Sequence, residues 1–205
     1  MLTLRDITRV SILAATGWIL MELIQVPLFP QAPYLRYDAG DIPVLIAALA
    51  LGPWRGVAVA AMKVLLFALF HPSPDILVVG APMNFLAGAS FALVAGTLYC
   101  GPRKTRAFGI LGLTLGGIAS AMLMIGANLT VLPLFLRIFM PQVSPPDPAT
   151  LRALLVGTIL PFNLIKSGLN GVLVFFVYKR ISPTLKAWNW EAPMVPVRAP
   201  REATS

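Results

Sequence analysis

Long apolar stretches, separated by short proline-rich segments, limit the possible folds of this chain more than any other feature. Apolar residues make up 58% of its 205 residues and charged residues only 12%, whereas a soluble domain usually carries about 25% charged residues. So little charge cannot cover a surface that faces water. The sequence therefore predicts an integral membrane protein.

The apolar stretches predict an all-α, polytopic membrane protein, a bundle of six transmembrane helices. A bilayer core about 30 Å thick needs roughly 20 apolar residues per helix, and prolines break the helices between spans. The predicted helices are residues 10–26, 41–51, 54–70, 76–99, 108–140 and 151–178. The second is short, and Asp41 is expected to cap it; Pro133 is expected to kink or end the fifth. Residues 1–186 would form the membrane domain, and 187–205 a poorly ordered tail.

Basic residues predict the orientation, because cytoplasmic loops of membrane proteins carry an excess of Lys and Arg. With the N-terminus inside, eleven basic residues fall in cytoplasmic segments, while the outer loops hold only Arg36, Arg137 and Arg152. Both termini are therefore expected in the cytoplasm. The net charge of +8 forms no basic stripe across a soluble face, so nucleic acid is not an expected partner.

Several kinds of chemistry find no support in the sequence. The single Cys100 and the lone His71 allow no intrachain disulfide and indicate no metal site. Residues 88–91 (Gly-Ala-Ser-Phe) resemble the serine motif of rhomboid proteases, but those enzymes need a histidine after the serine, and His71 precedes Ser90. No phosphate-binding loop of the Gly-x-x-x-x-Gly-Lys type occurs. We therefore expect a protein that is not an enzyme and has no cofactor or metal; active transport would need energy from another subunit.

Polar residues inside the predicted spans indicate a binding site, because they are costly at membrane depth. Asn163, Lys166 and Asn170 follow each other at offsets that place them on one helix face. An amide both donates and accepts hydrogen bonds, which suits the edge of a planar ring, and an ammonium group can donate to a ring carbonyl. Glu22 and Asn128 of other spans are expected near the same outer mouth, and Lys63 and Asn84 are further polar residues inside the predicted spans. The alternative is structural, with a Lys166–Glu22 ion pair and asparagines that tie helices together.

The outer loop, residues 27–40, is rich in proline yet largely apolar. Its apolar side chains are Leu28, Phe29, Tyr34, Leu35 and Tyr37. Irregular backbone cannot lie bare in lipid, so we expect this loop to cover the mouth formed by the first, fifth and sixth helices. The alternative is a loop that lies among lipid headgroups, where tyrosines are common.

Small residues recur at four-residue spacing, which lets helix backbones approach closely in a membrane. The repeats are Ala48, Gly52 and Gly56; Gly88, Ala92 and Gly96; and Gly112, Gly116 and Ser120. Packing within one bundle is the favoured interpretation. Ser11 and Ala15 on the first helix form a further repeat that could dock another membrane subunit.

Three segments resemble a known family. Residues 37–43 (Tyr-Asp-Ala-Gly-Asp-Ile-Pro), followed by Leu-Gly-Pro at 51–53, resemble the substrate-binding S-components of energy-coupling factor (ECF) vitamin transporters. Residues 84–91 and 160–166 (Leu-Pro-Phe-Asn-Leu-Ile-Lys) resemble the riboflavin-specific branch, the RibU family.

The resemblance implies a bacterial cell-membrane subunit that captures riboflavin from outside. It would deliver the vitamin inward when docked on a transmembrane coupling subunit with two ATPases. Riboflavin would be the transported ligand, not a cofactor. The resemblance assigns ring binding to Asn128, Asn163 and Lys166, and Leu35, Asp38, Gly80 and Asn84 are further expected binding residues. The family often carries Ala-x-x-x-Ala for docking, where this chain has Ser11 and Ala15.

Two other functions stay open at this point. The chain could be an S-component for another vitamin, such as thiamine or a queuosine precursor, which a flavin absorption spectrum would distinguish. It could also be a structural membrane subunit that binds no ligand. That alternative predicts that Asn163 and Lys166 are fully paired within the protein and that no enclosed outer cavity exists.

Overall fold

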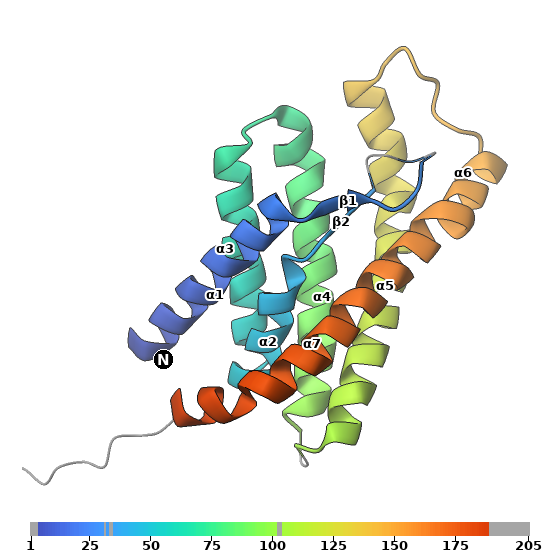
Figure 1. The fold of residues 1–205 in the computed structure, drawn as a ribbon. Helices are drawn as coiled ribbons and strands as arrows, with labels where there is room; N and C mark the ends of the chain where they lie inside the picture. The colour runs from blue at the N-terminus through green and yellow to red at the C-terminus, as the bar shows by residue number, and fades with distance from the viewer. Residues whose placement is uncertain (1–3, 31, 33–34, 102–103, 189–205) are drawn as a thin grey trace, which may run out of the picture.

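The structure, a computed structural model, describes residues 4–30, 32, 35–101 and 104–188. The described part is a bundle of helices with one short ribbon of two strands (Figure 1). In chain order the elements are α1 (Leu4–Leu23), β1 (Gln25–Pro27), β2 (Arg36–Asp38), α2 (Asp41–Leu51), α3 (Pro53–Phe70), a π-helical turn η1 (Ile76–Gly80), α4 (Ala81–Tyr99), α5 (Arg106–Phe139), α6 (Pro148–Leu154), a second π-helical turn η2 (Leu155–Ile159) and α7 (Leu160–Trp188).

Most predicted helices are confirmed, with shifted ends. The predicted boundaries of α2 are correct, and α1 begins at Leu4 rather than at residue 10. Pro133 lies inside α5 and does not end it. The last predicted helix is a continuous run of α6, η2 and α7 that extends to Trp188. Residues 189–205, and with them most of the predicted tail, lie outside the described part of the chain.

Two sequence-based expectations are wrong. The loop at 27–40 was expected to be irregular throughout, yet β1 and β2 pair antiparallel, with Val26 opposite Tyr37. Strand pairing satisfies backbone groups that would otherwise lie unpaired at the membrane. Asp41 does not cap α2; the N-cap is Gly40, and the Asp41 carboxylate binds a lysine instead.

The lengths and composition of the helices fit a multi-pass membrane protein. Four helical stretches are long and apolar enough to cross a membrane: Pro53–Phe70, Ile76–Tyr99, Arg106–Phe139 and Pro148–Arg180. Asp41–Leu51 is a shorter apolar helix. Many of the large apolar side chains on these helices, such as Leu65, Val156 and Phe176, are exposed on the outside of the bundle, as lipid-facing side chains are.

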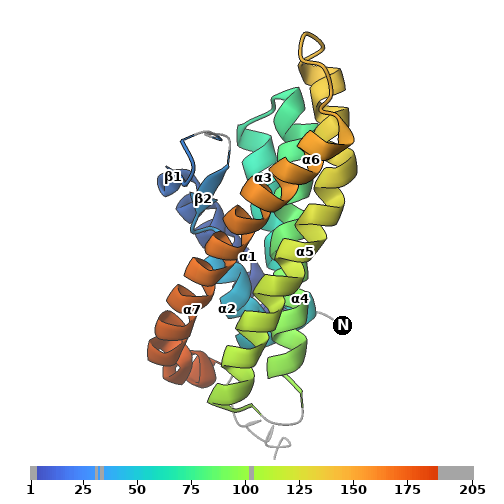
Figure 2. The same ribbon diagram turned by 90° about the vertical axis from the view of Figure 1, so that its right-hand side faces the viewer.

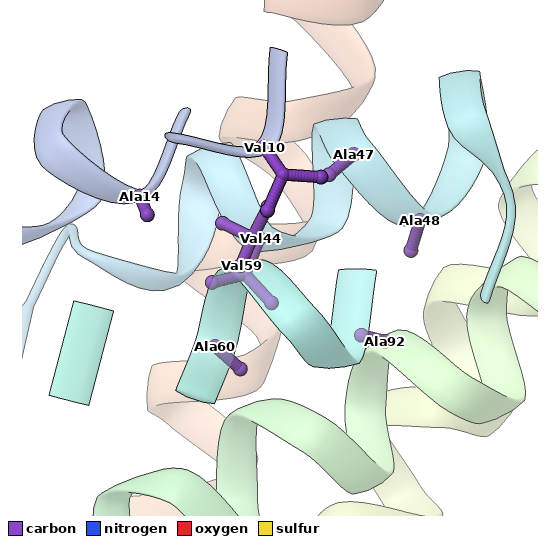
Figure 3. Close-up of a cluster of buried hydrophobic side chains, with 8 residues drawn as sticks. All are labelled: Val10, Ala14, Val44, Ala47, Ala48, Val59, Ala60 and Ala92. Carbon is purple, nitrogen blue, oxygen red and sulfur yellow. The ribbon is translucent and has the colours of Figure 1, made fainter. Parts of the chain in front are cut away.

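The short helix α2 lies at the centre of the bundle, where α1, α3, α4 and α7 pack against it. Because it is enclosed, it can be apolar on every side. Figure 3 shows one part of this core, which consists of Val10, Ala14, Val44, Ala47, Ala48, Val59, Ala60 and Ala92. Most of these side chains are small, so the four helices that contribute them approach one another closely.

Glycines confirm that the small-residue repeats pack within the bundle. A Cβ atom built on Gly56 would lie 2.6 Å from the Cβ of Ala48, and one on Gly112 would lie 2.8 Å from the carbonyl oxygen of Ala95. Gly52 has φ of 109°, a conformation that favours glycine, and it makes the tight turn between α2 and α3. The close contacts between these helices therefore depend on glycine, which has no side chain to separate the backbones.

Different connections between the helices lie at the two ends of the bundle. In Figures 1 and 2, the start of α1, the α4–α5 connection and the end of α7 lie towards the lower end. The β1–β2 ribbon, the α3–α4 connection and the α5–α6 connection lie in the upper half. In both views the ribbon lies beside α7.

Candidate functional site

Four charged side chains form a buried charge network between α2, α3, α7 and the β1–β2 ribbon. The exposed fractions are 4% for Asp38, 3% for Asp41, 0% for Lys63 and 8% for Lys166. The Nζ atom of Lys63 donates to Asp41 Oδ1 at 2.6 Å, and that of Lys166 donates to Asp38 Oδ2 at 2.6 Å. Lys166 Nζ also lies 3.7 Å from Asp41 Oδ2. Two positive and two negative charges therefore balance within one buried group.

Glycines make room for this network. A Cβ on Gly88 of α4 would lie 2.9 Å from Asp41 Oδ1. A Cβ on Gly40 would lie 2.8 Å from the carbonyl oxygen of Gly17 and 3.0 Å from Asp38 Oδ1. The corner between β2 and α2 can therefore lie against α1 only if residue 40 carries no side chain.

Asp38, in the ribbon outside the candidate spans, is held in its charged form. Burial alone would raise the pKa of its carboxyl group, but the positive charges of Lys166 and Lys63 lower it. Hydrogen bonds from the Lys166 ammonium and the Gly40 amide also lower it, and the net effect is a pKa below the usual value of a free aspartate. Asp38 is therefore an anion that needs a partner at neutral pH.

The face of α7 that carries the predicted binding residues is buried, as expected. The exposed fractions are 6% for Asn163, 8% for Lys166 and 1% for Asn170. Asn163 Nδ2 donates to the carbonyl oxygen of Ile159 in η2 at 2.8 Å. The Tyr37 hydroxyl donates to Asn170 Oδ1 at 3.0 Å. Two side-chain contacts thus join the ribbon to α7, Tyr37–Asn170 and Asp38–Lys166.

The other predicted binding residues lie on other elements of the fold. Asn128 on α5 is half-buried and donates to the carbonyl oxygen of Met124 at 2.8 Å. Asn84 on α4 and Leu35 before β2 are half-buried, and Gly80 in η1 is exposed. Among the described residues, no hydrogen bond or ion pair links these four to Asn163, Lys166 or Asp38. Within the described chain, Asp38 and Lys166 are thus the two members of the predicted set that contact each other directly, and Asn163 shares the buried α7 face with Lys166.

The structural alternative is wrong about the partner of Lys166. Glu22 accepts a hydrogen bond from Trp18 at 3.0 Å and lies 3.4 Å from His71 Nδ1, whereas Lys166 binds Asp38. That Lys166 and Asn163 have partners within the protein agrees with a subunit that binds no ligand. Two buried atoms argue against a subunit that binds no ligand. Asn84 Oδ1 and Asn170 Nδ2 lack partners within the described chain, and native interiors leave few such groups.

Sequence reasoning missed the roles of Tyr37, Asp41 and Lys63 in this region. It assigned Tyr37 to a cover and Asp41 to a cap, and it gave Lys63 no partner. A usable signal was present, since a buried lysine needs a buried carboxylate, and Asp38 and Asp41 lie three residues apart in one segment.

The predicted docking residues lie at the edge of the packed face of α1. Ser11 and Ala15 are half-buried, while Val10, Ala14 and Gly17 face the core. Their small side chains leave the flank of α1 narrow at this point.

Comparisons with known proteins agree with these features. A family model described as "ECF transporter, substrate-specific component" matches residues 5–178. The chain is 36% identical over 179 residues to the riboflavin transporter RibU of Staphylococcus aureus, covering 86% of this chain and 90% of that protein. It is 35% identical over 181 residues to the riboflavin transporter FmnP of Bacillus subtilis, covering 87% of this chain and 90% of that protein.

A solved structure is similar over almost the whole bundle. It is described as the S component of a bacterial ECF transporter, with a TM-score of 0.71 and 32% sequence identity, and the match covers 88% of this chain and 97% of that chain. Fold and sequence thus point to the same group of membrane transport subunits. This chain belongs to the family of substrate-specific components of ECF transporters.

Proposed function

We propose that this chain is the riboflavin-binding subunit of an ECF transporter in a bacterial cell membrane. It captures riboflavin from outside and delivers it inward while docked on a coupling subunit with two ATPases. Its six predicted helices form a transmembrane bundle with both termini in the cytoplasm. The main observation that supports this proposal is that Lys166 and Asn163 share one buried face of α7 beside the ribbon. Two relatives of the chain are also named as riboflavin transporters.

Binding in this proposal exchanges partners at Lys166. A ring carbonyl takes the place of Asp38 as acceptor for the ammonium, while Asp41, 3.7 Å away, still balances its charge. The amides of Asn163 and Asn128 bind the ring edge. The unpaired atoms Asn84 Oδ1 and Asn170 Nδ2 supply further polar contacts to the ligand.

The ribbon serves as the cover of the pocket. Its contacts Tyr37–Asn170 and Asp38–Lys166 hold it on α7, and Leu35 lies at its edge. When riboflavin binds Lys166 and Asn170, the ribbon exchanges these two contacts for contacts with the ligand that it covers. Part of the loop, including Tyr34, lies outside the described residues.

Docking on the coupling subunit is assigned to Ser11 and Ala15. Small side chains on the flank of α1 let a partner helix approach closely. This assignment is independent of the pocket, because the α7 contacts of the ribbon involve none of these residues.

Titration of the purified protein with riboflavin, and separately with thiamine, tests the proposal. In detergent, wild-type protein should quench flavin fluorescence saturably and show a flavin absorption spectrum after dialysis. Lys166→Met should lower riboflavin affinity about tenfold or more, because a hydrogen bond to a charged donor contributes about 1.5–3 kcal/mol. Asn163→Leu should act in the same direction.

Arg180→Met provides the matched control, since it removes a basic residue from an exposed position of the same helix. It should bind riboflavin like the wild type. Saturable thiamine binding without riboflavin binding would assign the chain to another vitamin, and binding of neither would favour the structural subunit.

A further inference from the structure

Two neighbouring hollows lie between α5 and α7, away from the proposed riboflavin site. Figure 1 shows α7 crossing α5 and then diverging from it towards the lower end. The first hollow, the α5–α7 groove, measures about 450 Å³. The second, the basic hollow, measures about 380 Å³. Leu113 and Phe175 line both hollows, so the two adjoin.

The α5–α7 groove is apolar and open to the outside of the bundle. Its walls come from residues such as Ile110 and Ile118 of α5 and Leu164 and Val172 of α7. Gly168 leaves part of it empty, because a Cβ atom built there would meet nothing within 4 Å. A groove of this kind within the bilayer suits a hydrocarbon chain.

The basic hollow combines three cations with apolar walls. Lys104 lines it from the segment before α5, Arg106 from the start of α5, and Lys179 from α7. All three side chains are exposed, and within the described part of the chain none of them forms an ion pair. No described aspartate or glutamate lines either hollow. The hollow therefore presents positive charge beside an apolar groove.

We propose that these adjoining hollows bind one anionic glycerophospholipid. Its phosphate lies among Lys104, Arg106 and Lys179, and one acyl chain lies in the α5–α7 groove. Basic pockets between transmembrane helices at the cytoplasmic surface recognise anionic lipid headgroups in this way. The site goes beyond riboflavin transport and uses none of the residues assigned to the vitamin or to docking.

The charges of the basic hollow and its continuity with the apolar groove favour a phospholipid over other occupants. A transmembrane helix of another subunit would fill the groove but leave three cations without an anion. A free phosphate would contact the cations but leave the apolar groove empty. A phospholipid matches both parts in the order in which they adjoin, with the charged headgroup at the helix ends and the chain towards the middle of the bilayer.

Native mass spectrometry of the purified, detergent-solubilised protein tests the proposal, and it does not depend on orientation in a membrane. The probes are dioleoyl phosphatidylglycerol and dioleoyl phosphatidylcholine at equal concentrations. Wild-type protein should retain one phosphatidylglycerol molecule at least tenfold more tightly than phosphatidylcholine. Millimolar inorganic phosphate should not displace it.

Two sets of variants separate the headgroup from the chain. The triple variant Lys104→Gln, Arg106→Gln, Lys179→Gln should lose the preference for phosphatidylglycerol. Gly168→Leu should reduce retention of both lipids, because its side chain occupies the groove. Gly126→Leu is the matched control, since Gly126 of α5 also has nothing within 4 Å of a built Cβ and lines neither hollow; it should retain lipid like the wild type.

Thermal unfolding of each variant checks that it is folded before lipid retention is compared. Equal retention of the two lipids by wild-type protein, or an unchanged preference in the triple variant, would overturn the proposal. Displacement of the lipid by inorganic phosphate would also overturn it and indicate a simple anion site. Unchanged lipid retention in Gly168→Leu, with loss of uptake in cells, would assign the groove to a protein helix instead.

Discussion

The balance of the buried charge network makes Lys166 and Asp38 energetically coupled, and this can be measured without ligand. Lys166→Met leaves two carboxylates and one lysine in the network, so Asp38 loses its 2.6 Å donor and the positive charge beside it. Removal of one partner from a buried ion pair costs about 3–5 kcal/mol. For a chain of this length that lowers the melting temperature by roughly 6–20 °C.

The single variant of the partner residue, Asp38→Asn, should destabilise the protein less than Lys166→Met. Asp38→Asn leaves one excess positive charge, but Lys166 still has Asp41 Oδ2 at 3.7 Å. The double variant Lys166→Met, Asp38→Asn restores neutrality, with the Lys63–Asp41 pair intact. It should therefore be more stable than Lys166→Met alone.

Thermal unfolding in detergent, followed by tryptophan fluorescence without riboflavin, completes a double-mutant cycle. Arg180→Met is the control for the loss of a basic side chain from α7 and should leave the melting temperature within about 2 °C, as expected for an exposed substitution. If the two single effects simply add in the double variant, Lys166 and Asp38 are not coupled, and the network does not hold the ribbon on α7.

Three further outcomes follow from packing and from the proposed function. Gly112→Ala should destabilise the protein by about 1–3 kcal/mol, because its Cβ would lie 2.8 Å from the Ala95 carbonyl oxygen, whereas Gly126→Ala has open space; unfolding of both variants in detergent compares them, and equal stability would refute the close contact. Ser11→Leu or Ala15→Leu should abolish riboflavin uptake in cells but preserve binding by purified protein, and normal uptake at equal expression would exclude docking through this flank. Saturating riboflavin should slow amide hydrogen exchange at residues 36–40 if the ribbon covers the ligand, and unchanged exchange there would leave the pocket without this cover.

The sequence predicts the helices well because their signal is local. Apolar length and proline breaks identify each span, so α2 is correct in both boundaries and the other helices differ mainly at their ends. The shared face of Asn163, Lys166 and Asn170 follows from helix geometry alone. The strand pairing of Val26 with Tyr37 carries no such signal, because three-residue strands between prolines have no readable period.

Contacts between side chains on different elements are harder to predict from the sequence than the set of residues that shares one helix face. Asp38 and Lys166 are 128 positions apart, and nothing in the local pattern joins them. The charge of Glu22 made it an equally reasonable partner, but its position beside Trp18 and His71 directs it elsewhere. Asp38 meets Lys166 only through the fold, in which the corner at Gly40 lies against α1 and β2 lies against α7.

The order of residues along the chain makes the buried charge network suited to stepwise synthesis. Asp38 and Asp41 leave the ribosome before Lys63 and long before Lys166, so each lysine reaches the membrane when its carboxylate is already present. A lone lysine at the centre of a helix costs about 2.5–3.5 kcal/mol to insert. With only 11 residues, α2 is too short to cross alone, and its insertion with α3 as one hairpin would neutralise Lys63 on entry. We therefore expect Asp41→Asn to impair the insertion of α3, an effect on biogenesis that precedes any effect on the finished fold.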